Sequence, residues 1–125
     1  MKRLSELDIS ELSPIAVLYH PYKQEALELS EELCHILEKE LGLVLVFCGS
    51  TDEALSRSDM LSGSKLLVSV GGDGTFLRVA RLALGVGAFV WPVAAGTFNF
   101  IPDVLRDLSP ENLKRGFRCY GYPIF

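Results

Sequence analysis

The sequence contains few cysteines and no closely spaced pair of them. The three are Cys34, Cys48 and Cys119, and no CxxC motif is present. This pattern argues against a zinc site and against the disulfide framework of small secreted domains. We interpret the three residues as small core residues of a protein in a reducing cytoplasm.

An excess of positive charge is also lacking. The chain has 12 Lys and Arg residues against 16 Asp and Glu residues, which gives a formal net charge of −4. Proteins that bind a nucleic-acid backbone need a basic face. We therefore expect no nucleic-acid partner.

One stretch lacks charged residues altogether, from residue 82 to residue 102. Helix breakers interrupt it at Gly85, Gly87, Pro92 and Gly96. Breakers at this density suit buried strand and loop better than a helix in a bilayer. No membrane association is predicted.

Short apolar runs alternate with amphipathic or polar segments along the rest of the chain. The predicted strands are 15–20, 43–48, 65–70 and 88–93, and the predicted helices are 24–41, a short one from Thr51, 75–84, and 109–116. Gly42 is the predicted end of the first helix, and Thr51 or Asp52 the N-cap of the second. Residues 117–125 are read as a last strand or the beginning of a further segment. The alternation predicts an α/β fold, with a Rossmann-like parallel sheet and helices on both faces.

The most informative segment is VGGDGTFLRVARLA, which begins at Val70. A run of β-formers stops at Gly71 and Gly72, Asp73 and Gly74 follow, and a helical pattern begins at Thr75. Ligands of parallel sheets bind at the carboxyl ends of strands. Glycines there permit positive φ and close approach of a ligand, and the N–H groups at a helix start attract anions. Thr75 can cap the helix or donate to a phosphate. The loop therefore favours phosphate binding.

Asp73 needs a separate explanation, because a carboxylate repels phosphate. It can act as a general base toward an attacking hydroxyl, hold magnesium between itself and the phosphates, or accept hydrogen bonds from a ribose. The alternative without function is that Asp73 caps the helix. Two other nucleotide motifs are absent: no GxxxxGK[ST] occurs, and position 77 is Leu where GxGxxG requires glycine.

The segment resembles the signature of the NAD kinase family, whose GGDGT core is shared with diacylglycerol and sphingosine kinases. The continuation Phe76-Leu77-Arg78 and the opening IAVLYHP, followed by EALELSEEL, are similar to NAD kinases in particular. The resemblance implies transfer of a phosphoryl group from ATP or polyphosphate to the adenosine-ribose 2′-hydroxyl of NAD, which gives NADP. Magnesium would come with the nucleotide, and no protein metal site is expected.

The resemblance also implies roles for individual residues. Asp73 matches the catalytic aspartate, and Gly74 its NAD-binding neighbour. Gly71, Gly72 and Thr75 match the phosphate-facing loop. Arg78, one turn further on, either reaches a ligand phosphate, pairs with an acid, or is an exposed helical arginine.

A second conserved segment of the family matches this sequence less well. PVAAGTFNFIPDV stands where NAD kinases usually have GxNxGxLGFL; Gly96 and Phe100 match, whereas Ala94, Thr97 and Asn99 do not. Gly96 is a further predicted ligand-binding residue. Two alternatives therefore stay open: a lipid or sugar kinase domain of the same superfamily, and a non-catalytic nucleotide-binding domain.

The family's second, mostly β domain supplies an Asn-Glu pair, and this sequence contains no Asn-Glu dipeptide. We therefore divide the chain into an N-terminal arm (1–14), a Rossmann-like nucleotide-binding domain (15–116) and the start of a crossover to a second domain (117–125). A chain of this kind is expected to be only weakly active alone. Its apolar end would favour a homo-oligomer.

Overall fold

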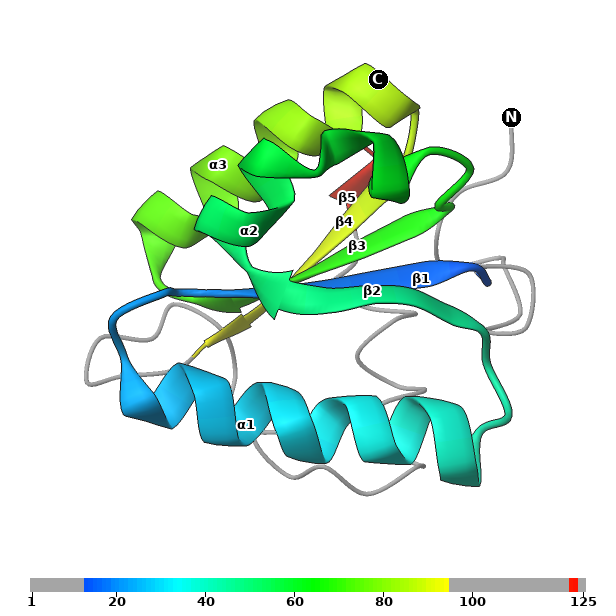
Figure 1. Cartoon of the computed structure of the whole chain (residues 1–125), viewed down its shortest axis with the longest axis vertical. Coiled ribbons are helices and arrows are strands. Elements are labelled where there is room, and N and C mark those ends of the chain that lie inside the picture. The colour runs from blue at the N-terminus through cyan, green and yellow to red at the C-terminus, as the bar shows by residue number, and fades with distance from the viewer. Residues whose placement is uncertain (1–12, 95–121, 124–125) are drawn as a thin grey trace.

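The computed structural model describes residues 13–94 and 122–123, which form a sheet with helices on both faces (Figure 1). Four strands run parallel, and a short fifth strand pairs antiparallel with the fourth. They are β1 (Ile15–Tyr19), β2 (Leu45–Ser50), β3 (Leu66–Gly71), β4 (Phe89–Ala94) and β5 (Tyr122–Pro123), in the order β2-β1-β3-β4-β5. The predicted Rossmann-like α/β fold is confirmed.

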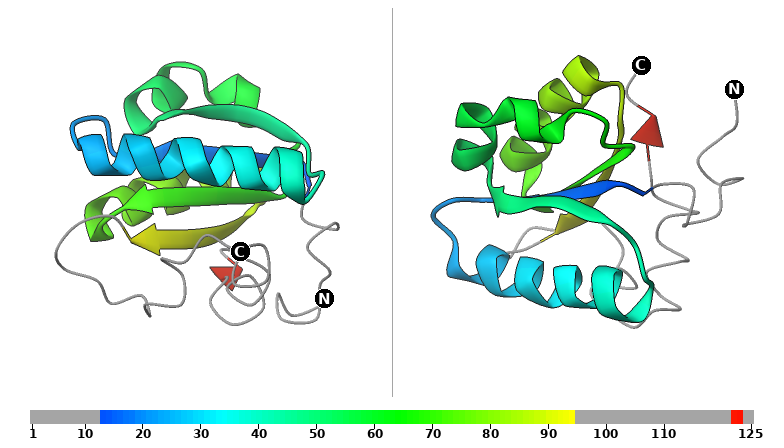
Figure 2. Two further views of the ribbon diagram at one scale, coloured as in Figure 1. Left: turned by 90° about the horizontal axis from the view of Figure 1, so that it is seen from below. Right: turned by 45° about the vertical axis from the view of Figure 1, so that its right-hand side comes forward.

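The helices divide between the two faces of the sheet (Figure 2). Helix α1 (Gln24–His35) continues as the π-helical turn η3 (Ile36–Glu40) and covers one face. Helix α2 (Thr51–Ser56) and helix α3 (Asp73–Val86) cover the other, with the 3₁₀ turn η4 (Ser58–Leu61) after α2. This is the arrangement that right-handed crossovers between parallel strands produce.

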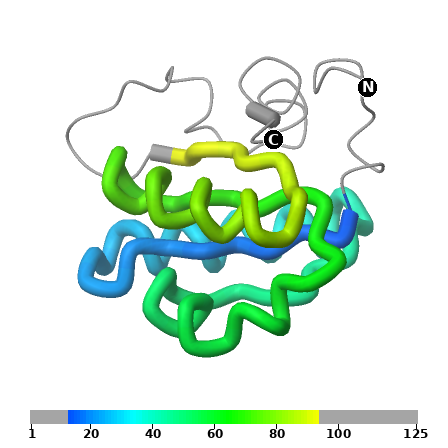
Figure 3. Tube along the Cα trace, turned by 90° about the horizontal axis from the view of Figure 1, so that it is seen from above, coloured from blue at the N-terminus to red at the C-terminus, as the bar shows by residue number. Residues whose placement is uncertain are grey.

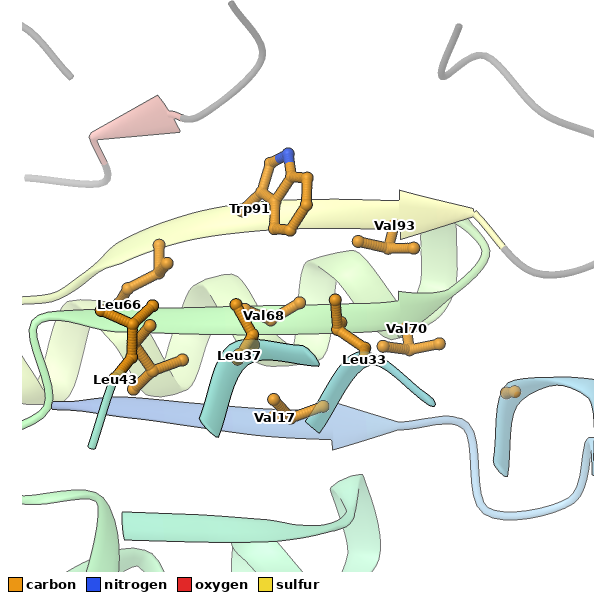
Figure 4. Close-up of a cluster of buried hydrophobic side chains, with 11 residues drawn as sticks. Val17, Leu33, Leu37, Leu43, Leu66, Val68, Val70, Trp91 and Val93 are labelled. Carbon is orange, nitrogen blue, oxygen red and sulfur yellow. The ribbon is translucent and has the colours of Figure 1, made fainter. Parts of the chain in front are cut away.

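Two apolar cores follow from the alternation of side chains along the strands. Val17 and Val68 point to the α1 face, where they pack with Leu33 and Leu37 (Figure 4). Their neighbours Ala16, Leu18 and Leu67 point to the other face and pack against α2 and α3. Strands β1 and β3 are thus buried on both sides, which explains why they read as continuous apolar runs.

Glycines in the left-handed conformation end two helices. Gly42, at φ +67°, follows η3, and Gly87, at φ +73°, is the C-cap of α3. The prediction for Gly42 is confirmed. A side chain at either position would be strained, because left-handed backbone places Cβ against the carbonyl oxygen.

The predicted cap of α2 is wrong. Its N-cap is Ser50, whose hydroxyl accepts a hydrogen bond from the Glu53 N–H at 3.1 Å, while the Glu53 carboxylate accepts one from the Ser50 N–H at 3.3 Å. This is a capping box, which satisfies two backbone donors at once. Strand β2 also begins two residues later than predicted, because Leu43 is drawn into the core below α1 and its N–H binds the Leu37 carbonyl at 2.9 Å.

The interpretation of the cysteines as core residues is wrong for Cys48 on β2, which is exposed. Cys34 on α1 is half-buried and packs against the edge of the core, and both are free thiols. Their sulfur atoms lie 2.9 Å apart. Cys119, Gly96, the predicted helix 109–116 and the domain boundary at residue 116 lie outside the described residues.

Candidate functional site

The site lies where the chain leaves two neighbouring strands in opposite directions. β1 and β3 are adjacent in the sheet, and the His20 N–H donates to the Val70 carbonyl at 3.0 Å beyond the end of β1. From β1 the chain turns to α1 on one face, and from β3 it turns to α3 on the other, so that both turns lie at one end of the sheet (Figure 3). Such a switch in direction opens a crevice at the carboxyl ends of parallel strands.

A cavity of about 300 Å³ occupies this crevice. It is lined by residues of the turn after β1, the first residue of α2, and the first turns of α3. These are His20, Pro21, Tyr22, Lys23, Thr51, Gly72, Asp73, Gly74, Thr75 and Arg78. The cavity therefore brings together five of the seven predicted site residues. Gly71 lies directly behind it at the end of β3.

Helix α3 begins at Asp73 and not at Thr75 as predicted. The N-cap is Gly72, and no side chain caps the helix. Asp73 is exposed as the first helical residue, and Thr75 is buried within the first turn. Capping, the alternative role of Asp73 and one role considered for Thr75, is therefore wrong for both residues. The Asp73 carboxylate stands free at the helix start, beside N–H groups that have no partner within the helix.

The glycines of the loop do not adopt positive φ, which was one of the two reasons predicted for them; the other was close approach of a ligand. None of Gly71, Gly72 or Gly74 has a positive φ. A Cβ on Gly71 would lie 2.5 Å from Thr75 Oγ1, too close for any side chain. A Cβ on Gly72 or Gly74 would meet no atom within 4 Å. Gly74 is thus a glycine inside a helix, which costs stability relative to alanine, and the described fold does not need it.

This difference predicts opposite effects of two matched substitutions. Gly71→Ala forces the buried Thr75 side chain to move and is expected to lower the free energy of unfolding by about 1–3 kcal/mol. Gly74→Ala is expected to leave it unchanged or raise it by up to about 1 kcal/mol. Urea denaturation of both variants measures the contrast, and equal losses in the two would contradict the packing argument.

Three elements meet in a polar network at the rim of the cavity. Asp52 on α2 accepts a hydrogen bond from the Tyr22 hydroxyl at 3.2 Å and forms an ion pair with Arg78 on α3 at 3.4 Å. Arg78 therefore pairs with an acid, one of the three roles considered for it. Both side chains of the pair are about half exposed, at 55% and 47%, so the pair adds little to stability and leaves the guanidinium accessible.

His20 is held as a neutral donor at the wall of the cavity. Its Nδ1 accepts a hydrogen bond from the Tyr22 N–H at 3.1 Å, which leaves the proton of the neutral ring on Nε2. Burial lowers the pKa of His20, the charges of Lys23 and Arg78 lower it further, and Asp52 opposes them. The neutral form is therefore favoured in the folded protein.

The titration of His20 checks this electrostatic arrangement. Asp52→Asn removes the opposing negative charge and is expected to lower the pKa of His20 further, whereas Arg78→Gln is expected to raise it. The unfolded chain binds this proton more tightly, so acidification below pH of about 6.5 costs stability at this residue. NMR titration of the imidazole signals, with the exposed His35 as internal reference, measures both shifts. A shift of the His20 pKa in the same direction in the two variants would contradict the opposite roles given to Asp52 and Arg78.

Thr51 contributes a buried hydroxyl to the same cavity. Its side-chain oxygen is inaccessible and has no hydrogen-bond partner among the described residues, although the residue lines the cavity. A buried hydroxyl without a partner costs free energy.

Sequence reasoning missed half of this cavity. Four of the missed residues follow the first strand in HPYK (His20 to Lys23), and Thr51 follows the second. The available signal was their position at carboxyl ends of predicted parallel strands. Gly96, the remaining predicted residue, falls in the part of the chain that is not described.

Membrane and metal features were sought in the same described ranges. None of the helices there has both the length and the apolarity to cross a bilayer. Between residues 13 and 94, and at 122–123, no group of three or more His, Cys, Asp or Glu side chains is placed to hold a metal ion.

Fold and cavity together define an α/β protein with a parallel sheet and a glycine-rich strand-to-helix turn at its ligand crevice. The chain is 36% identical over 96 residues to the NAD kinase of Chloroflexus aurantiacus, an alignment that covers 77% of this chain and 34% of that protein. It is 32% identical over 105 residues to the NAD kinase of Chloroflexus aggregans, covering 84% and 36%. These similarities support a relationship to the NAD kinase family.

A more distant relative is the NAD kinase of Acetivibrio thermocellus, at 26% identity over 107 residues and 81% of this chain. The chain spans about a third of the length of the curated relatives that it matches. No protein-family model matches it.

Proposed function

We propose that this chain is the nucleotide-binding part of an NAD kinase, which transfers the γ-phosphoryl group of ATP, or a phosphoryl group of polyphosphate, to the 2′-hydroxyl of the adenosine ribose of NAD. The observation that carries the proposal is the Gly72-Asp73-Gly74 turn. Its carboxylate is not used as a helix cap, and its two glycines leave open space at the switch-point cavity. The similarity to NAD kinases supports NAD as the substrate.

Asp73 is the proposed general base. Its carboxylate accepts the proton of the 2′-hydroxyl while the hydroxyl oxygen forms a bond to the phosphorus and the bond from phosphorus to the leaving oxygen breaks. Asp73 suits this role because it is exposed at the cavity and has no hydrogen bond or ion pair with another described side chain. Phosphoryl transfer depends mainly on positioning and on stabilisation of charge.

The surrounding residues suit the phosphates. Gly72 and Gly74 carry no Cβ, so an anion can reach the N–H groups at the start of α3. Lys23 and Arg78 bring positive charge to the crevice, and the Nε2 of His20 offers a hydrogen-bond donor.

Magnesium fits this arrangement as an ion that arrives with the nucleotide. Asp73 is the one carboxylate in the described lining of the cavity. Mg²⁺ is commonly held by one or two carboxylates together with substrate phosphates. The bound ion would supply charge neutralisation at the transferring group, and Asp73 would be its protein ligand if it does not serve as the base.

The test is NADP formation from NAD and Mg-ATP, measured with an NADP-specific cycling assay on this chain, with one of its NAD kinase relatives as the positive control. We expect the turnover of this chain to be weak compared with that of the control, because the chain spans about a third of the relative's length. A chain that phosphorylates a lipid or sugar but not NAD would replace this proposal by another kinase of the superfamily. Nucleotide binding without any turnover would replace it by a non-catalytic binding domain.

A further inference from the structure

The second cluster of reactive side chains is the pair Cys34 and Cys48, which lies outside the cavity. Cys34 is on α1, and Cys48 is on β2, the strand at the edge of the sheet. Fourteen positions separate them in the chain, and α1 packs back across the sheet so that the two sulfur atoms lie 2.9 Å apart. Cys48 is exposed and Cys34 is half-buried, so a small reagent can reach the pair from solvent.

We propose that Cys34 and Cys48 form a reversible oxidation site, which a low-molecular-weight disulfide such as oxidised glutathione converts to an intramolecular disulfide joining α1 to β2. A disulfide bond is about 2.05 Å long, so the sulfur atoms need to approach by only about 0.9 Å. The native packing therefore accommodates the bond without separating α1 from the sheet.

The order of the two steps follows from exposure and hydrogen bonding. The Cys48 thiolate attacks one sulfur of the reagent, and the other sulfur leaves as a thiolate. Cys34 then loses its proton and attacks the sulfur of Cys48, which expels the second thiol. The two protein thiols together lose two hydrogen atoms, and the reagent gains them as two thiols, so a dithiol in excess reverses the reaction.

The electrostatic surroundings assign the attacking role to Cys48. The hydrogen bond between the two sulfur atoms lowers the pKa of Cys48. The same hydrogen bond and burial raise the pKa of Cys34. Among the described groups, the acids facing the pair are Glu31, Glu38 and Glu53, and Tyr19 lies close as well. These acids oppose ionisation of the thiols, so the reaction is expected to accelerate as pH rises.

The bond would close a short loop that contains the end of α1, η3 and the first part of β2. Cross-links across loops of this length stabilise a small domain, and we expect the melting temperature to rise by about 10 °C. Cys48 lies two residues before the Ser50 cap of α2, and none of the residues that line the cavity takes part. The inference therefore does not depend on the proposed function.

The test uses a Cys119→Ser protein, so that only the two thiols of interest remain. We expect treatment with oxidised glutathione to remove both thiols, to lower the intact mass by two hydrogen atoms, to leave no glutathione attached, and to form no disulfide between two chains. Dithiothreitol should restore both thiols and the lower melting temperature. Peptide mapping of the wild-type chain should identify the same link between residues 34 and 48, which keeps the test valid if Cys119→Ser folds poorly.

Single-cysteine variants provide the matched controls. In a Cys34→Ser, Cys119→Ser protein, Cys48 has no partner and should retain one bound glutathione. In a Cys48→Ser, Cys119→Ser protein, Cys34 should react more slowly than Cys48 does. The proposal is overturned if both thiols stay free, if each retains its own glutathione, if the bond joins two chains, or if the bond forms without raising the melting temperature.

Discussion

Asp73→Asn is expected to lower the rate of NADP formation by about 10²–10⁴-fold, the loss that follows removal of a general base. The substitution keeps the shape of the side chain and removes its ability to accept the proton of the 2′-hydroxyl. Because the first turn of α3 stays intact, nucleotide binding should be nearly unchanged, and the loss should appear in kcat rather than in KM. Steady-state kinetics with NAD and Mg-ATP would measure both constants.

The matched control for this prediction is Asp59→Asn, an exposed acid on η4 that does not line the cavity. It carries the same change of charge and should leave kcat unchanged. Thermal melting should show that Asp73→Asn loses no more than about 1 kcal/mol, the contribution of an acid at a helix N-terminus. An Asp73→Asn protein with kcat within a few-fold of the wild type would show that another group takes the proton.

The second large effect is expected for Leu33→Ala in the core between α1 and the sheet. The Leu33 side chain is fully buried and packs in the cluster that contains Val17 and Val68. Removing it leaves a cavity that the close-packed strands fill only in part, so the free energy of unfolding should fall by about 2–5 kcal/mol. Losses of this size are a large part of the stability of a small domain.

Leu77→Ala on α3 provides the comparison, because it is the same substitution in another helix at a side chain that is 59% exposed. Its effect should stay within about 0.5 kcal/mol. Urea denaturation with a common m-value would measure both. A loss at Leu33 no larger than the loss at Leu77 would contradict the assignment of Leu33 to the core.

The parallel sheet was predictable because local signals agree along the chain. Strands β1 and β3 are buried on both faces and therefore appear as unbroken apolar runs in the sequence. Gly42 marks the end of a helix because glycine readily adopts the left-handed conformation found there. The predictions failed where several neighbouring residues suit the same role. Ser50, Thr51 and Asp52 are all good caps, and only the position at which β2 ends selects Ser50.

The Gly-Asp-Gly turn was located correctly at the end of a strand, but its geometry was not. Sequence reasoning attributed the glycines to positive φ and to close approach of a ligand. Positive φ is wrong, because Gly71 is required by the close approach of Thr75, and Gly72 and Gly74 face open space. Contacts of this kind depend on the direction in which α3 leaves the sheet, so they cannot be predicted from a local pattern in the sequence.

By itself, therefore, the sequence determined the alternation of strands and helices, the α/β class and the position of Asp73 at a strand end, because these depend on periodicity and on residue types close together in the chain. The tertiary structure alone decided that β1 lies beside β3, which brings His20 and Thr51 to the same cavity as Asp73. It also decided that Cys34 meets Cys48. Strand order and helix packing arise from burial of apolar surface between distant segments, and spacing along the chain carries no record of that choice.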